Sequence, residues 1–269
     1  MSIKAKNYVQ VFGRGAQTMI CAHGYGCDQN MWRFLTPAFQ DAYRIVLFDL
    51  VGSGRSDLTA YDRTKYSSLQ GHADDLLAIM HEFADGPAVF VGHSVSAMIG
   101  LLAGIAEPEL FSSHVMIGPS PRYVNDGDYI GGFSQADIDS LLDTLDSNYL
   151  GWASAMAPTI MGAPDRPELG QELTNSFCAT DPEIAKHFAR TTFLSDNRAD
   201  LPKLQTRTLI LQNTDDLIAP VAVGHYMHQK LPNSVLRMVE NIGHCPHLSA
   251  PEAIAAAMND FLQAPDGQP

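Results

Sequence analysis

Short runs of consecutive apolar residues alternate along the chain with longer stretches in which apolar residues recur every three or four positions. Continuous apolar runs are typical of strands buried on both faces of a parallel sheet, and the longer periodicity is typical of helices. We expect strands at residues 18–22, 43–48, 88–91, 113–117, 207–211 and 234–239. We expect helices at residues 67–83, 95–105, 221–231 and 251–262. This alternation predicts an α/β fold with a mostly parallel central sheet flanked by helices.

The alternation stops between residues 118 and 207, where no apolar run is typical of a strand. Helical patterns fill this stretch at residues 135–149, 151–160, 168–178 and 182–194. Ser134 and Asp181 precede the first and last of these patterns, and both side chains are suited to cap a helix N-terminus. We therefore expect a core made of residues 1–122 and 200–264. Residues 123–199 are expected to be inserted in it as a four-helix lid over the carboxyl edge of the sheet.

Composition narrows the class of function. The 269 residues carry a formal net charge of -13, which repels nucleic acid and anionic membranes, and no apolar run has the length of a membrane span. We expect neither nucleic acid nor membrane as a partner. The first ten residues lack the pattern of a secretory signal, and the four cysteines have neither paired nor zinc-binding spacing. These features favour a reduced, cytoplasmic location.

The segment GHSVS at residues 92–96 follows a predicted buried strand and opens a predicted helix. A nucleophilic serine needs this context, because a sharp strand-to-helix turn exposes its hydroxyl at the sheet edge. We therefore predict that Ser94 is a nucleophile. The backbone N–H of Val95, the first of the helix, then faces an oxyanion forming beside Ser94. Ser96 stands where glycine is usual in this motif, and its small side chain is compatible with the turn.

A serine hydroxyl needs a general base, and the base needs an orienting carboxylate. The segment GHCPH at residues 243–247, after the last predicted strand, supplies His244, with His247 as the alternative. The loop after the preceding strand supplies Asp216, with Asp215 as the alternative. We assign Asp216 because the segment LIAP leads from it into the next helix. The chain order serine, aspartate, histidine is that of enzymes whose nucleophile sits on a strand-to-helix turn.

The segment HGYG at residues 23–26 follows the first predicted strand. Its glycines let the backbone approach a ligand closely, so the backbone N–H of Tyr25 is expected to be the second oxyanion donor. The glycine-rich loop at residues 52–56 lacks the lysine of phosphate-binding loops, and we expect a structural turn there. His225 and His228 have no third ligand, so no metal and no other cofactor is expected.

With these motifs the chain resembles the α/β-hydrolases, and among them the RsbQ-type bacterial proteins and their plant relatives, the karrikin and strigolactone receptors. The segments that carry the resemblance are HGYGCDQ at 23–29 with Trp32, FDLVGSG at 48–54, GHSVSAMIG at 92–100, SPRYVND at 120–126, GGF at 131–133, SNY at 147–149, AP at 157–158 and GHCPHLS at 243–249. They are distributed over nearly the whole chain. A serine at the position of Ser96 is common in this branch.

The resemblance implies a catalytic triad of Ser94, Asp216 and His244. It implies an oxyanion hole made by the backbone N–H groups of Tyr25 and Val95, and a V-shaped lid of four helices above a pocket. The pocket residues that it implies are Tyr25, Tyr123, Leu141, Trp152, Met156, Leu173, Phe193, Leu217 and Ile218.

We expect a serine hydrolase that cleaves a small apolar ester or lactone through an acyl-enzyme. Relatives often have aromatic residues where this chain has Met156 and Leu173, which indicates a differently shaped pocket. The alternative hypothesis is a ligand-sensing signalling protein with slow turnover that acts through a protein partner. RsbQ-type proteins act with a protein partner in a bacterial stress-response pathway, and the plant relatives are receptors. Both hypotheses use the same triad.

Overall fold

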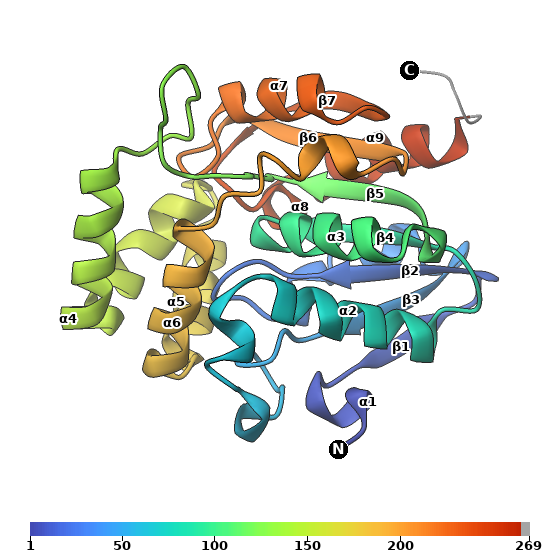
Figure 1. Ribbon diagram of the computed structural model, residues 1–269, viewed down its shortest axis with the longest axis horizontal. Coiled ribbons are helices and arrows are strands. Elements are labelled where there is room, and N and C mark those ends of the chain that lie inside the picture. Colours follow the sequence, from blue (N-terminus) through green and yellow to red (C-terminus); the bar gives the residue numbers. More distant parts are fainter. Residues whose placement is uncertain (265–269) are drawn as a thin grey trace.

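The computed structural model describes residues 1–264, and its centre is one seven-stranded sheet (Figure 1). The strands are β1 (Gln10–Gly13), β2 (Gln17–Ala22), β3 (Tyr43–Phe48), β4 (Ala88–His93), β5 (Phe111–Ile117), β6 (Thr208–Asp215) and β7 (Ser234–Ile242). Their order in the sheet is β1-β3-β2-β4-β5-β6-β7. β1 runs antiparallel to β3, and all other neighbouring pairs are parallel. The parallel strands therefore end at one common edge.

Helices cover both faces of this sheet (Figure 1). They are α1 (Ile3–Lys6), α2 (Gln70–Phe83), α3 (Val95–Ala106), α4 (Gln135–Met161), α5 (Pro167–Ala179), α6 (Pro182–Phe193), α7 (Val221–Lys230), α8 (Pro246–Ser249) and α9 (Pro251–Gln263). Side chains of α2, α3 and α7 pack on one face and those of α9 on the other. Because successive strand residues point to opposite faces, Ile20 joins the first layer and Met19 the second. Both faces are buried, which explains the uninterrupted apolar runs.

The predicted mostly parallel α/β fold is confirmed. The sequence pattern missed β1, because this four-residue edge strand is largely exposed and has no apolar run. The helix expected from residue 67 begins at Gln70, and residues 65–67 form a separate 3₁₀ turn. None of the helices within residues 1–264 is both long and apolar enough to cross a bilayer.

Helices α4, α5 and α6 are inserted between β5 and β6 and stand beyond one end of the sheet in Figure 1. α4 is bent at Asn148, whose backbone angles (φ -154°, ψ 69°) are not helical, so the insertion has four helical segments. The bend lies inside the helix expected at residues 135–149, shortly before the expected break. The domain boundaries at residues 122 and 200 stay a prediction.

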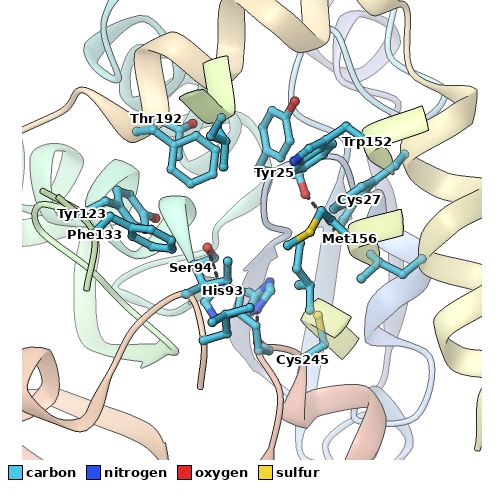
Figure 2. Close-up of a pocket in the computed structure, with 18 residues that line it drawn as sticks. Tyr25, Cys27, His93, Ser94, Tyr123, Phe133, Trp152, Met156, Thr192 and Cys245 are labelled. Atoms are coloured by element: carbon cyan, nitrogen blue, oxygen red, sulfur yellow. Dashed lines mark hydrogen bonds between the residues drawn. The ribbon is translucent and has the colours of Figure 1, made fainter. Parts of the chain in front are cut away.

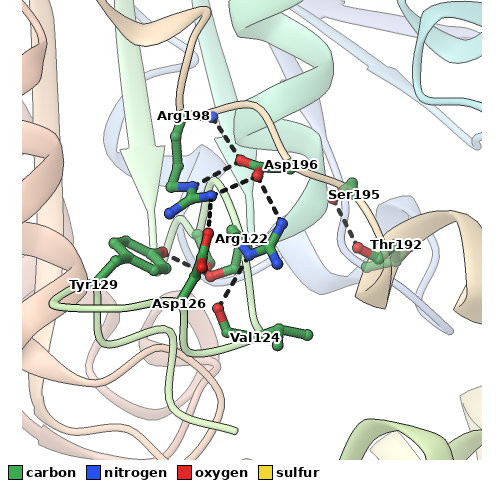
Figure 3. A network of polar contacts seen from close by, with 9 residues as sticks. Arg122, Val124, Asp126, Tyr129, Thr192, Ser195, Asp196 and Arg198 are labelled. Atoms are coloured by element: carbon green, nitrogen blue, oxygen red, sulfur yellow. Dashed lines mark hydrogen bonds and ion pairs between the residues drawn. The ribbon is translucent and has the colours of Figure 1, made fainter. Parts of the chain in front are cut away.

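A network of ion pairs joins the two ends of this insertion (Figure 3). Arg122, which follows β5, contacts Asp196, which follows α6, with 2.6 Å between Nη1 and Oδ2. Arg198 contacts both Asp126 and Asp196 at 2.7 Å. The backbone N–H of Asn197 donates to a carbonyl on the opposite segment. The entry and exit of the insertion are thereby held together beside the core.

Candidate active site

Ser94 occupies the turn between β4 and α3 with φ 56° and ψ -125°, an unusual conformation for a residue with a side chain. Its N–H donates to the carbonyl of Ile117 at 2.9 Å, which fixes the turn to the end of β5. A Cβ on Gly92 would lie 2.7 Å from the carbonyl oxygen of Ser96, so the turn requires glycine there. The hydroxyl of Ser96 donates to the carbonyl of His23 at 2.5 Å. Ser96 thus links the turn to the loop after β2.

His244 lies between Ser94 and Asp216. Its Nε2 is 2.8 Å from Ser94 Oγ, and its Nδ1 is 2.7 Å from Asp216 Oδ2. Because a carboxylate only accepts, Nδ1 carries the proton, and Nε2 is left with a lone pair toward the Ser94 hydroxyl. The second oxygen of Asp216, Oδ1, accepts the backbone N–H groups of Ile218 at 2.8 Å and Ala219 at 3.2 Å. All three side chains are buried.

The two alternatives from the sequence lie elsewhere. Asp215 is exposed, and its carbonyl accepts the N–H of Gly243 at 2.8 Å. His247 is buried between Trp32 and His93, with ring centroids 4.8 Å and 4.4 Å away. Burial, and next the nearby His244, lower the pKa of His247 to about 3. His247 is therefore a neutral core residue without contact to Ser94.

The loop after β2 lies against Ser94. A Cβ on Gly24 would be 3.2 Å from the Ser94 Cβ and 2.6 Å from His93 Nδ1, so only glycine allows this approach. Tyr25, the next residue, is buried, and its hydroxyl donates to the carbonyl of Ala185 in α6 at 3.0 Å. Val95 is the first residue of α3, where backbone N–H groups have no acceptor within the helix. The segments of both expected oxyanion donors therefore adjoin Ser94.

A cavity opens above Ser94 (Figure 2), and His244 also lines it. About 640 Å³ in and around it is not filled by protein atoms, and part of this volume is open solvent. The expected pocket residues that line it are Tyr25, Tyr123, Leu141, Trp152, Met156, Leu173, Phe193, Leu217 and Ile218, which is the whole predicted set. They come from the core loops and from α4, α5 and α6. The insertion thus forms one wall of the cavity.

Other lining residues lie outside the predicted set. They are Cys27, His93, Phe133, Ile160, Phe177, Thr192 and Cys245. Cys27 and Cys245 flank the expected motifs, which was the available signal for them, whereas Phe177 and Thr192 are ordinary positions in helical patterns. Phe177 stacks on Trp152 with an interplanar angle of 3° and 5.7 Å between centroids.

The environment of the cavity is apolar. Burial raises the pKa of Cys27 and that of Cys245, so both remain thiols at neutral pH and are unsuited to act as nucleophiles. Burial also raises the pKa of Tyr123, and its hydrogen bonding with Ser94 acts in the opposite direction. Within residues 1–264, no three histidine, cysteine or acidic side chains are grouped so that they could hold a metal ion.

The chain belongs to the alpha/beta hydrolase family, whose model matches residues 19–257. A karrikin insensitive 2 receptor from Petunia hybrida is 40% identical over 253 residues, 94% of each protein. A strigolactone esterase from Arabidopsis thaliana is 38% identical over 255 residues, 94% of this chain and 95% of the relative. The solved structure of a hydrolase from Oleispira antarctica has a TM-score of 0.95 and 40% identity, covering 98% of this chain and 97% of the other. The expected resemblance to the karrikin and strigolactone proteins is confirmed.

Proposed function

We propose that this protein is a serine hydrolase that cleaves a small, mostly apolar ester or lactone. The observation that carries the proposal is the hydrogen-bonded series Ser94–His244–Asp216, with separations of 2.8 and 2.7 Å, at the floor of an apolar cavity. This geometry has the roles required of a nucleophile, a general base and an orienting carboxylate. Membership of the hydrolase family supports the same chemistry.

In the proposed reaction, Ser94 Oγ attacks the carbonyl carbon of the substrate while its proton passes to His244 Nε2. Asp216 stabilises the resulting imidazolium. The carbonyl oxygen takes the negative charge and accepts hydrogen bonds from the backbone N–H groups of Tyr25 and Val95. The alcohol leaves with the proton from His244, and an ester of Ser94 remains.

Water completes the cycle by the same steps in reverse. His244 takes a proton from water, the hydroxide attacks the acyl-enzyme, and Ser94 leaves with the proton as the acid is released. The helices α4, α5 and α6 form the wall above Ser94, and we propose that residues 123–199 act as the lid that excludes bulk water during these steps.

The test of this mechanism is the hydrolysis of a short-chain p-nitrophenyl ester with the early time course recorded. Ser94→Ala is expected to lose the burst and to reduce turnover by about 10⁶-fold, with the fold retained. Asp216→Asn is expected to reduce kcat by about 10⁴-fold, because it removes the carboxylate that orients His244. The matched control is Asp215→Asn at the exposed neighbour, which is expected to keep wild-type turnover. Wild-type rates in Ser94→Ala would contradict the mechanism.

A second candidate function is ligand sensing, favoured by the 40% identity to a protein named as a receptor over 94% of the chain. In this case the same acyl-enzyme forms but is hydrolysed slowly. While it persists, the insertion covers the cavity, and this closed conformation recruits a protein partner. The time course distinguishes the two functions. A burst followed by sustained turnover favours an ordinary hydrolase, whereas a burst of one equivalent followed by very slow release favours the sensor.

A further inference from the structure

Thr192, in the last turn of α6, lies in the wall of the apolar cavity and has an isolated hydroxyl. The residue lines the cavity and is only 1% exposed. Within residues 1–264 its Oγ1 is buried and has no hydrogen-bond partner. In Figure 2 Thr192 enters from α6, whereas Ser94 enters from the core. The polar groups of the reaction centre and this hydroxyl therefore belong to different walls of one cavity.

The lack of a partner is unusual for a threonine in a helix, whose hydroxyl commonly bonds to the carbonyl four residues earlier. The hydroxyl of the adjacent Thr191 has two carbonyl acceptors within reach for its one proton, that of His187 at 3.2 Å and that of Tyr66 at 3.0 Å. Thr174 in α5 makes the same local bond at 2.9 Å. Thr192 makes no such bond within the described residues, so a ligand would displace no internal partner of its hydroxyl.

The backbone around Thr192 is held firmly. Its carbonyl accepts both the N–H of Ser195 at 3.2 Å and the Ser195 hydroxyl at 2.8 Å (Figure 3). The following residues belong to the ion-pair network that joins the ends of the insertion. The backbone that carries the hydroxyl is therefore held in place before a ligand arrives, which limits the entropy lost when it binds.

We propose that Thr192 is a specificity-determining residue that donates a hydrogen bond to a second oxygen of the substrate, away from the carbonyl that Ser94 attacks. A buried hydroxyl without a partner is unfavourable, and a ligand that supplies an acceptor removes this cost. A ligand that has a methylene group beside the hydroxyl leaves this cost in place. The preferred substrate is thus a compact ester or lactone that is apolar except for one further ether, carbonyl or ring oxygen. This inference rests on the proposed function and names its substrate class.

The test compares p-nitrophenyl alkanoates with ether analogues in which one chain methylene is replaced by oxygen, at each chain position in turn. Thr192→Val removes the hydroxyl at nearly constant volume, and Thr192→Ser keeps it. For the analogue whose oxygen reaches residue 192, we expect the ratio of kcat/KM for ether over alkanoate to fall about tenfold in Thr192→Val. Thr192→Ser is expected to keep the wild-type ratio, and the intrinsic reactivities of the esters cancel between variants. Equal ratios in the wild type and Thr192→Val for every analogue would overturn the proposal.

Two further measurements separate this inference from the proposed function. In the Ser94→Ala background, the binding of the same esters, followed by the fluorescence of Trp152 in the cavity wall, is expected to show the same tenfold change in the ratio of Kd values. If Ser94→Ala hydrolyses the esters at the wild-type rate but Thr192→Val still changes the kcat/KM ratio, the triad proposal fails and the role of Thr192 stands. Thr192→Val is also expected to raise Tm, because it removes an unpaired buried hydroxyl. A lower Tm would show that the hydroxyl has an internal partner and would refute the inference.

Discussion

His93, the neighbour of Ser94, contacts both loops that complete the candidate site. Its Nε2 lies 2.8 Å from the carbonyl oxygen of His244, and because a carbonyl only accepts, Nε2 carries the proton. The opposite nitrogen, Nδ1, faces Gly24. Burial first, and then the nearby His247, hold the pKa of His93 well below its usual range, so the ring stays neutral. One side chain thus supports the base and the oxyanion loop together.

We expect His93 to act as a positioning residue. His93→Phe keeps a ring but loses the donor to the His244 carbonyl, and a small displacement of His244 is expected to lower kcat by about 10- to 100-fold with little change in KM. His93→Gln retains an N–H and is expected to recover part of kcat. Steady-state kinetics with pH profiles check both variants. A loss confined to KM, or equal losses in the two variants, would mean that His93 serves only packing.

Among single residues, the sequence predicted the reactive residues more completely than it predicted the residues of the cavity wall. The positions of Ser94, Asp216 and His244 follow from the ends of three strands, and the alternatives Asp215 and His247 lie outside the hydrogen-bonded series. Thr192 could not be found in this way. Whether a helical residue faces a cavity depends on the rotation of its helix, and periodicity does not fix that rotation to within one residue.

Among the helices and strands, the bend in α4 has the clearest effect on the cavity. Asn148 interrupts the helix, and its Oδ1 accepts the N–H of Gly151 at 3.0 Å, the bond of an N-cap. The helical segment that follows contributes Trp152 and Met156 to the cavity wall. The cap therefore determines where the segment that carries these side chains begins.

Removing this cap is expected to weaken the insertion. Asn148→Ala leaves the N–H of Gly151 without its acceptor and is expected to lower the free energy of unfolding by about 1 kcal/mol. Asn148→Asp retains a cap and serves as the matched control, because the residue is exposed in both variants. Urea unfolding of the wild type and both variants provides the measurement. Equal stabilities of the Ala and Asp variants would show that the hydrogen bond contributes nothing.

The elements themselves were largely predictable, for a physical reason. Strands buried on both faces, such as β4, are apolar over most of their length, and the insertion helices have apolar faces at helical spacing. β1 was not predicted because it is a short, largely exposed strand at the edge of the sheet. Its sequence has no apolar run and does not differ from that of a loop. The contact between the Tyr25 hydroxyl and α6 could not be predicted from the sequence, because it depends on the tertiary structure.

Across the whole molecule, several histidines are enclosed in the core as neutral groups. Neither ring nitrogen of His72, His114 or His247 has a hydrogen-bond partner within residues 1–264. Burial lowers the pKa of each to about 3. In the unfolded chain a histidine has a pKa near 6.5. The contribution of these histidines to the free energy of unfolding is therefore fully present above about pH 6.5. It is lost progressively as the pH falls toward 3, because the unfolded state then binds more protons than the folded state.

This linkage predicts a steep acid destabilisation to which His114 contributes separately from the active site. His114 stacks on Phe111 with 4.6 Å between centroids, and burial is the sole cause of its lowered pKa. His114→Leu removes its titration, so between pH 5.5 and 4 the fall in unfolding free energy is expected to be shallower by about 1.4 kcal/mol per pH unit. Urea unfolding at several pH values checks this, with the exposed His225→Gln as control. An unchanged slope in His114→Leu would mean that His114 is protonated in the folded protein, and the core would then have to contain a counter-charge.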